Sequence, residues 1–434
     1  MDVICKLNAT TMEAVWMWRF SIDLVTCFLC VTGTGSCSCD VFIFYHPPAL
    51  TMASAVVYPT ISCEDPLFQK ADRWGGLPSD LPDTEAPAYI VNQFLHGAAC
   101  WLFMRPLFSA HGYILYYSSD TLPWDTFPEP LPEAMQNPEY PYARRCYERD
   151  EDALFGVDSI RVWAARDAVG RDVVIRVVSD ADEPSNELKV LQYLNEEGIR
   201  LDPRNRTIHV IEFLTFYNLI FAVMPRFIFS VDFTVRFDLI FGFFFSWDSA
   251  FRADFGTVAE VMQCGEQFLE CLEFLQEHRI FHGDILGQNV GMNIVAHSNK
   301  YNATGRRDPS VTRYAVYDFG NSQLYPRDVS LRDFRATPHF NFSNYDLPFP
   351  TGPFNPFAVD FLGVALLLQR RVRHVENFVP ALGPYFDRLI LVDEDKRPSA
   401  SEALLEFREI LSQLSASQLS EKITTLTWEK GRCP

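Results

Sequence analysis

The chain has 434 residues, enough for two or three domains, with a formal net charge of -19 and a pI near 4.9. So acidic a chain lacks the basic surface that sequence-independent nucleic-acid binding requires and the Lys/Arg clusters that hold proteins to anionic membranes, so we expect neither partner. The 11 cysteines are odd in number and scattered. They predict reduced thiols in an intracellular compartment, cytoplasmic or nuclear, rather than a disulfide framework.

Residues 1–60 are interpreted as an N-terminal extension. The apolar run at residues 20–33 is short and interrupted by Asp23. It therefore fits neither a transmembrane helix, which needs about 20 apolar residues, nor a signal peptide. Four cysteines of the extension permit a four-thiolate zinc site, although apolar neighbours and an unusual C-x-C spacing favour buried or free thiols. They are Cys27, Cys30, Cys37 and Cys39.

Residues 61–150 form a region rich in proline and acidic residues, whose helix breakers exclude long helices over most of its length. It reads either as a solvated linker or as an arm that binds a partner. The aromatic run at 89–108 is the exception, and it predicts one helix that docks on the domain that follows.

A β-rich segment follows at residues 151–225. Runs at 160–167 and 172–178 are joined by a turn at Gly170 and predict a hairpin. Leucines at helical spacing in 185–200 predict a helix, and 207–225 contains two further strands. The order predicts a small antiparallel sheet that carries one helix.

Residues 226–415 are expected to be mainly helical, and 416–434 form a tail. Within 227–250, large apolar residues alternate over an unusually long run, which indicates either a buried hairpin or a non-native insertion. A helix is predicted to begin at Thr257, where Glu260 completes a possible capping box, and another at Ser399.

Two segments carry the chemistry. One contains His282, Asp284 and Asn289, and the other contains Asp318 followed by Phe319 and Gly320. Phosphoryl transfer needs hard oxygen ligands for the metal ions that bridge ATP phosphates, and one carboxylate to receive the proton of the attacking hydroxyl. These residue types supply both.

The combined pattern, HxDxxxxN followed by DFG, resembles the protein-kinase signature. The amino-acid sequence of residues 155–410 is most similar to the sequences of the divergent protein-kinase-domain proteins of basidiomycete fungi. The resemblance implies an α+β fold of two lobes, a small β-rich N-lobe (151–225) and a larger helical C-lobe (226–415). It also implies ATP and Mg²⁺ as cofactors and transfer of the γ-phosphate to a Ser/Thr hydroxyl of an unknown protein substrate.

Roles carry over from the family by position. Asp284 and His282 fall in the catalytic loop, while Asn289 and Asp318 match the metal ligands. Arg176 matches the strand lysine that holds the phosphates, and Glu187 its helix partner. Met224 matches the hinge between the lobes, and Asp360 the helix that anchors the catalytic loop.

Several positions depart from the family pattern. Arg176 replaces a lysine, a change that is not conservative in shape or hydration. Only Gly156 remains where a Gly-rich loop is expected, Leu286 stands where a lysine is usual, and Gly283 replaces the HRD arginine. If the enzyme is active, it therefore does not need the switch in which that arginine clamps a phosphorylated activation loop.

Three functions stay open on these grounds. The first is an ATP-dependent protein kinase, and the second is a pseudokinase that keeps the fold as a binding module. The third is a small-molecule phosphotransferase of the aminoglycoside or choline kinase type, whose catalytic loop shares the HGDxxxxN form. The C-terminal RPSASEAL string favours the protein-kinase branch.

Overall fold

The computed structural model describes residues 2–5, 16–21, 24–25, 61–74, 86–116, 141–146, 160–226, 255–296, 307–337, 352–423 and 428. The chain divides into two compact units. The first comprises Met1–Val57 with Phe233–Phe245, and its described part is an antiparallel sheet of β1 (Asp2–Cys5), β2 (Trp16–Ser21) and β3 (Leu24–Val25). The four clustered cysteines and the alternating segment 227–250 lie outside the described residues.

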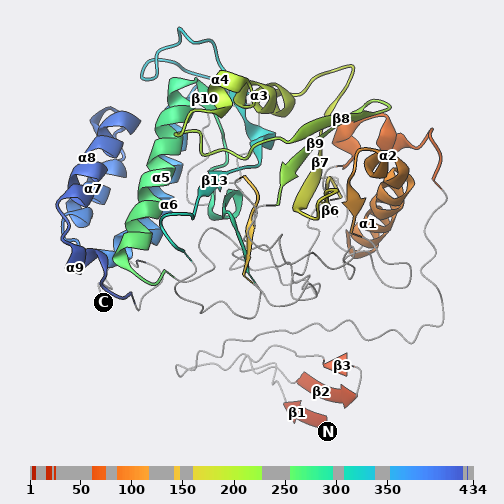
Figure 1. Ribbon diagram of the computed structural model, residues 1–434, viewed down its shortest axis with the longest axis horizontal. Helices are drawn as coiled ribbons and strands as arrows, with labels where there is room; N and C mark the ends of the chain where they lie inside the picture. Colours follow the sequence, from red (N-terminus) through yellow and green to blue (C-terminus); the bar gives the residue numbers. More distant parts are fainter. Residues whose placement is uncertain are drawn as a thin grey trace, which may run out of the picture. The chain divides into compact units, whose positions relative to one another are not determined.

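The second unit, Tyr58–Asp232 with Ser246–Pro434, is a mixed α+β structure built on a five-stranded antiparallel sheet (Figure 1). The strand order is β4-β6-β7-β9-β8. The bounds are β4 (Ile114–Leu115), β6 (Val162–Arg166), β7 (Asp172–Asp180), β8 (Glu212–Phe216) and β9 (Leu219–Pro225). The hairpin predicted from the sequence is confirmed, because β6 and β7 pair in register from Val162 opposite Arg176. Gly170 adopts a φ of 89° in its turn, a conformation that glycine reaches without strain.

The helix predicted at 185–200 is also present. Helix α3 (Asn186–Leu194) begins where the Ser185 hydroxyl accepts a hydrogen bond from the Leu188 amide, and a short α4 (Glu197–Arg200) follows. Leucines along α3 are buried, and the helix lies against the sheet. The small antiparallel sheet that carries a helix is therefore observed, with β4 as an added edge strand.

The single helix predicted at 89–108 is wrong, because two helices form there: α1 (Ala86–Phe103) and α2 (Arg105–Ala110). Pro106 explains the break, since it has no amide proton to continue the hydrogen-bond ladder of α1. Docking is observed: the Trp101 indole donates to the Ile160 carbonyl at 2.8 Å and stacks on Trp163. Residues 61–116 thus belong to the same unit as the sheet, and β4 pairs with β6.

The remaining part of the second unit is mainly helical. Its helices are α5 (Val258–Glu277), α6 (Pro356–Arg371), α7 (Leu382–Leu389), α8 (Ala400–Ser412) and α9 (Ala416–Leu419). Its short strands are β10 (Ile280–Phe281), β11 (Val290–Met292), β12 (Ile294–Ala296), β13 (Tyr314–Val316) and β14 (Gln323–Leu324), and β12 pairs with β5 (Arg144–Cys146).

The two predicted caps differ in outcome. Ser399 and Glu402 form a full capping box at α8. At α5, Thr257 caps the Glu260 amide, but the Glu260 carboxylate accepts from the Gly256 amide instead of that of Thr257.

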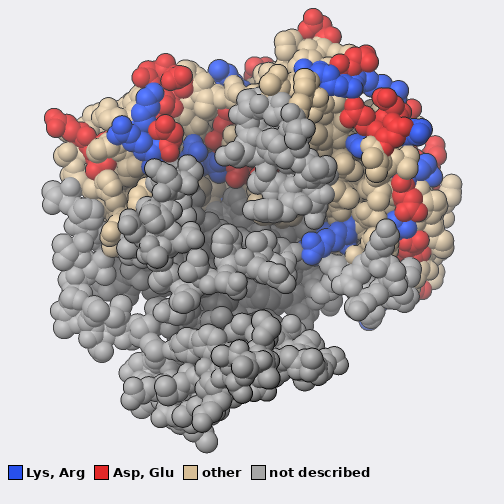
Figure 2. Space-filling model, turned by 180° about the vertical axis from the view of Figure 1, so that it is seen from behind, with Lys and Arg blue, Asp and Glu red and all other residues tan. Residues whose placement is uncertain are grey.

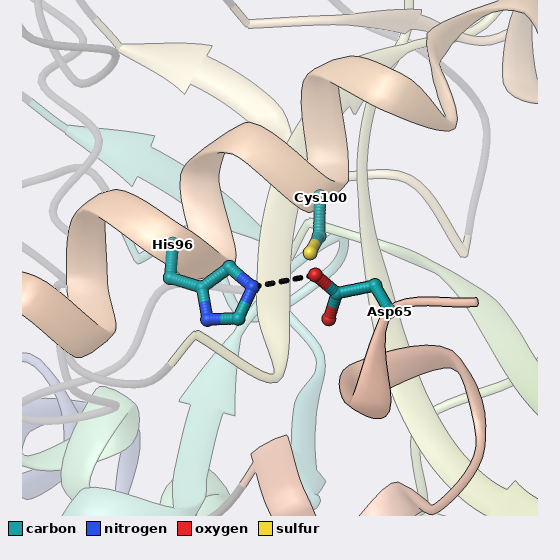
Figure 3. A group of neighbouring side chains, drawn as sticks. All are labelled: Asp65, His96 and Cys100. Carbon is teal, nitrogen blue, oxygen red and sulfur yellow. Dashed lines mark hydrogen bonds and ion pairs between the residues drawn. The ribbon is translucent and has the colours of Figure 1, made fainter. Parts of the chain in front are cut away.

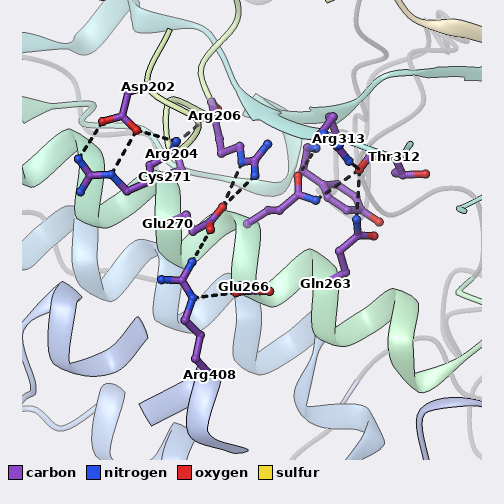
Figure 4. Close-up of polar contacts among 12 residues, drawn as sticks. Asp202, Arg204, Arg206, Gln263, Glu266, Glu270, Cys271, Thr312, Arg313 and Arg408 are labelled. Atoms are coloured by element: carbon purple, nitrogen blue, oxygen red, sulfur yellow. Dashed lines mark hydrogen bonds and ion pairs between the residues drawn. The ribbon is translucent and has the colours of Figure 1, made fainter. Parts of the chain in front are cut away.

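Helix α5 fixes the position of β13 through buried amide side chains (Figure 4). The Gln267 side chain donates to the Thr312 carbonyl at 3.3 Å and accepts from the Tyr314 amide at 3.0 Å. On the same helix, Glu270 accepts hydrogen bonds from Arg206 and from Arg408 of α8. Because Gln267 bonds on both sides of residue 313, the register of β13, and of the residues that follow it, is set by α5.

The described surface in Figure 2 carries basic and acidic side chains intermixed rather than one basic patch. Among the described residues, no helix combines the length and apolar character needed to cross a bilayer.

Candidate functional site

A two-stranded antiparallel ribbon brings the two chemistry-bearing segments together. Strand β11 begins directly after Asn289, and β13 ends shortly before Asp318. Val290 is paired with Val316, and the Tyr317 amide donates to the Asn289 carbonyl at 3.0 Å. Antiparallel pairing therefore places Asn289 and Asp318 at the same end of the ribbon.

The loop before β11 is held by a buried carboxylate on α6. Asp360 accepts hydrogen bonds from the His282 amide at 2.6 Å and from the Gly283 amide at 3.0 Å. The Asp360 side chain is buried, and burial raises its pKa to about 7. The anchoring that the sequence resemblance implied for Asp360 is present in these two contacts.

His282 is fully buried and joins the two segments through its ring. Its Nε2 lies 3.0 Å from the Tyr317 carbonyl, while its Nδ1 accepts from the Asp284 amide at 3.2 Å. These partners require a neutral ring with the proton on Nε2. Burial, partly offset by the Tyr317 carbonyl, lowers the pKa of His282 to about 4, and its ring meets Phe319 edge-on at 4.8 Å.

Asp284 and Asn289 are bound to one another. The Asn289 amide nitrogen donates to the backbone carbonyl of Asp284 and to its carboxylate Oδ2, both at 2.8 Å. Both residues are buried. Because the nitrogen is directed at Asp284, the Asn289 carbonyl oxygen is the atom that can serve as a cation ligand.

Gly283 is required by the shape of this loop. Its φ is 81°, and a Cβ at this position would lie 2.9 Å from the Asn321 backbone oxygen. Glycine at this position is therefore a consequence of the local backbone. No larger side chain fits without moving the loop or the segment after Asp318.

Across from the loop, Arg176 of β7 bridges two carboxylates. Its Nη2 donates to Asp318 Oδ1 at 2.7 Å, and its Nε lies 2.7 Å from Glu187 Oε1 of α3. The pair of Arg176 and Glu187 expected from the sequence is thus present. The contact with Asp318 was not expected, and it joins the sheet half directly to the end of the ribbon.

The charges of this cluster follow from burial and pairing. Burial would raise the pKa of Asp318, but the Arg176 guanidinium and other contacts outweigh it and hold the pKa below its usual range. For Glu187, burial dominates and its pKa is raised despite Arg176. Asp318 also adopts a φ of 64°, a strained conformation for a residue with a Cβ, while its side chain accepts from the Gly320 amide.

An apolar cavity of about 20 Å³ adjoins this cluster. Arg176, Glu187 and Asp318 line it together with Met224 and apolar residues such as Val162 and Val174. A cavity of this size holds about one water molecule, so a purine ring enters only if its walls move apart. Of the predicted site residues, His282, Asp284 and Asn289 are not among those that line it.

Sequence reasoning missed Arg161, which lies beside the cluster. Its Nη2 is 4.0 Å from Glu187 Oε2, and burial lowers its pKa although Glu187 acts in the opposite direction. No sequence motif marks this residue. Arg161 directly precedes Val162 of β6, and Val162 pairs with Arg176. Its position in the predicted hairpin, next to the partner of Arg176, is therefore the feature that could have indicated it.

Neither a comparison with protein-family models nor a search of curated proteins returned a match to this chain.

Proposed function

We propose that residues 155–410 form a two-lobed protein-kinase-like fold that transfers the γ-phosphate of ATP to a protein hydroxyl, with Ser/Thr as the acceptor. The observation that carries the proposal is the ion-pair bridge from Glu187 through Arg176 to Asp318. It joins the sheet, α3 and the ribbon at the point where the family pattern requires a phosphate-binding cation and a metal ligand.

The residues of the site support distinct roles. Asp284, braced by Asn289, is the carboxylate that receives the hydroxyl proton, and His282 holds the loop backbone in place. Arg176 supplies positive charge for the phosphates, and Met224 lies on the wall of the cavity that we assign to adenine. Asp318 and the carbonyl oxygen of Asn289 are hard oxygen donors that suit Mg²⁺, which characteristically takes one or two protein ligands and completes its shell with phosphates and water. Bound Mg²⁺ and ATP would supply the phosphoryl group and neutralise its charge.

A pseudokinase is the second candidate, and two observations favour it. Arg176 is already engaged by two carboxylates, and the adjoining cavity holds about one water molecule. A nucleotide must therefore compete with Asp318 for Arg176 and open the cavity. A pseudokinase would keep this closed arrangement as its working state.

The test is a thermal-shift titration of the full chain with ATP and Mg²⁺, followed by a phosphotransfer assay on a panel of protein acceptors. A ligand that binds only the folded state raises its melting temperature. We expect a Mg²⁺-dependent rise that is lost in Asp318→Asn and kept in the matched surface variant Asp395→Asn. If the melting temperature of a folded sample does not rise at millimolar ATP, nucleotide binding is contradicted and the pseudokinase becomes the favoured function.

A further inference from the structure

A second cluster of polar side chains lies away from the site described above, between the segment 61–74 and helix α1. It consists of Asp65, His96 and Cys100, whose ligand atoms all lie within 4.8 Å of one another (Figure 3). His96 and Cys100 are four residues apart on α1 and so project from one face of the helix. Asp65 comes from the opposite side, at the start of the 3-10 turn Pro66–Phe68.

We propose that these three side chains bind one Zn²⁺ ion, with a fourth position open to water or another ligand. A thiolate, an imidazole and a carboxylate form a mixed ligand set that zinc accepts, and three protein ligands with one open position are an established arrangement for it. Among the described residues, this is the group of three or more His, Cys, Asp and Glu side chains that is close enough to hold a metal ion.

The distance from His96 to Asp65 is compatible with a tetrahedral ion after a small movement, and the Cys100 sulfur lies within 4.8 Å of both other ligand atoms. His96 Nε2 lies 2.7 Å from Asp65 Oδ2, whereas two such ligands on one zinc stand about 3.3 Å apart. His96 must therefore move by about 0.6 Å. Its side chain is 37% exposed, which leaves room for this movement and gives the ion a path from solvent.

The other two ligands are held more firmly. Cys100 is fully buried in α1, and the Asp65 side chain is only 10% exposed. The second oxygen of Asp65, Oδ1, accepts a hydrogen bond from the Leu67 amide at 2.9 Å. Hydrogen bonds of this kind orient a ligating carboxylate and leave its other oxygen directed at the metal.

A Cys-His-Asp hydrolase site is the competing interpretation, and the geometry does not favour it. In such a site the imidazole stands between the thiol and the carboxylate and activates the thiol. Here the Asp65 carboxylate lies between the imidazole and the thiol instead (Figure 3), so His96 is not placed to activate Cys100. A fully buried thiol is also inaccessible to a substrate.

The bound ion would fasten the segment 61–74 to α1. That segment also contacts the end of β7, where the Ala71 amide donates to Asp180 at 2.6 Å and Lys70 forms an ion pair with the same carboxylate. Helix α1 is fixed to the sheet independently by Trp101. The ion would therefore add a cross-link to the contacts that already join the two pieces. These are the ion pair of Asp65 with His96 and the ring contacts of Phe68 with Phe103 and of Trp74 with Trp101.

The test uses the full chain, purified under reducing conditions and stripped with a chelator, and titrates it with zinc sulfate against a chromophoric competitor. We expect one zinc equivalent that binds at least about 100-fold more weakly in Asp65→Asn, His96→Gln and Cys100→Ser, since removing a ligand costs no less than removing its supporting contact. Cys63→Ser, which changes an exposed thiol two residues from Asp65, is the matched control and keeps the affinity.

Cobalt chloride gives a second readout that identifies the ligands. The Co²⁺ complex should show a thiolate-to-metal charge-transfer band that disappears in Cys100→Ser and persists when Cys27, Cys30, Cys37 and Cys39 are all replaced by serine. Zinc affinity that is the same in wild type and His96→Gln would overturn the proposal, as would binding that depends on the four N-terminal cysteines instead. Because His96 is partly exposed, its variant remains a valid test if Cys100→Ser fails to fold.

Discussion

The two sides of the candidate phosphotransfer site are built differently. On the side of the loop 282–289, most of the polar contacts are made to the backbone. Asp360 accepts from two amides, His282 contacts the backbone of two segments, and Asn289 donates to the carbonyl of Asp284 as well as to its carboxylate. On the sheet side, three charged groups satisfy one another, with Arg176 between Glu187 and Asp318. The first side is organised without a ligand, whereas the second must rearrange before phosphates can reach Arg176.

The difference matches where the sequence departs from the protein-kinase pattern. The loop keeps the residues of the protein-kinase pattern at His282, Asp284 and Asn289. Glycine at 283 is explained by a backbone conformation that excludes a side chain, whereas Leu286 stands where that pattern has a lysine. The other departures are Arg176, Leu286 and the missing glycines, and they fall at positions that contact the ATP phosphates in the protein-kinase pattern. The two sides of the candidate site can therefore be tested separately: the loop 282–289, proposed for the chemical step, and the cluster around Arg176, proposed for nucleotide binding.

The largest expected effect concerns the chemical half. Asp284→Asn should lower the phosphotransfer rate by about 10²–10⁴-fold, the usual contribution of general acid–base catalysis. ATP binding should be unchanged, because Asp284 does not line the cavity. Phosphotransfer by rapid quench, together with the ATP-dependent thermal shift, measures both. A variant with wild-type rate would remove Asp284 from the mechanism.

The next largest expected effect concerns Asp360, which holds the loop 282–289 through two backbone amides. Asp360→Ala leaves the His282 and Gly283 amides buried without their acceptor, at a cost of about 1–3 kcal/mol each. We expect the free energy of unfolding to fall by about 2–5 kcal/mol in urea denaturation, since partial relaxation offsets some of the sum. Asp395→Ala on the surface should change it by less than about 0.5 kcal/mol. Equal stability of the two variants would show that the anchor does not hold the loop.

A pH prediction follows from the buried ring of His282. Its pKa is lowered to about 4 in the folded protein, so between pH 6.5 and 4 the unfolded chain binds the extra proton. Stability is therefore fully present above pH 6.5 and is lost as the pH falls through this window, by about 3 kcal/mol from this residue. His282→Gln should flatten the stability profile between pH 7 and 4 by that amount. The buried His209 and His374, also lowered to about 4, contribute equally in both proteins and cancel.

Local patterns predicted the longer strands of the five-stranded sheet and helices α3, α5 and α8. Two β-rich runs joined by a turn at Gly170 predicted the β6–β7 hairpin, and cap residues predicted the starts of α5 and α8. The prediction of a single helix from the aromatic run at 89–108 is wrong because the run contains Pro106, which cannot donate to the preceding turn. Strand β4 was missed because it is two residues long and pairs with a strand more than 40 residues away in sequence. Short strands are defined by their partner rather than by their own pattern.

The candidate sites show the same division. Spacing within a segment indicated His282, Asp284 and Asn289, since they share one loop. The bridge from Arg176 to Asp318 and the cluster of Asp65, His96 and Cys100 join residues far apart in the chain. Their proximity depends on how β7 meets the ribbon and how the segment 61–74 meets α1. No single stretch of sequence carries that information.

The smallest expected effect is that of Arg176→Lys. It gives the most direct test of the difference between the two sides of the site, because it changes only the residue that joins Glu187 to Asp318. Lysine at this position cannot contact two carboxylates through a planar fork, so Arg176→Lys should keep the pair with Glu187 and release Asp318. The free energy of unfolding should fall by about 1.5–3 kcal/mol, the usual net value of one hydrogen bond to a charged group. If the bridge restrains the nucleotide-binding half, the ATP- and Mg²⁺-dependent rise in melting temperature should increase relative to wild type. The matched control Arg388→Lys changes an exposed arginine in α7 and should leave that rise unchanged. A smaller rise in Arg176→Lys would show instead that the guanidinium itself holds the phosphates, and that the bridge to Asp318 yields readily when ATP arrives.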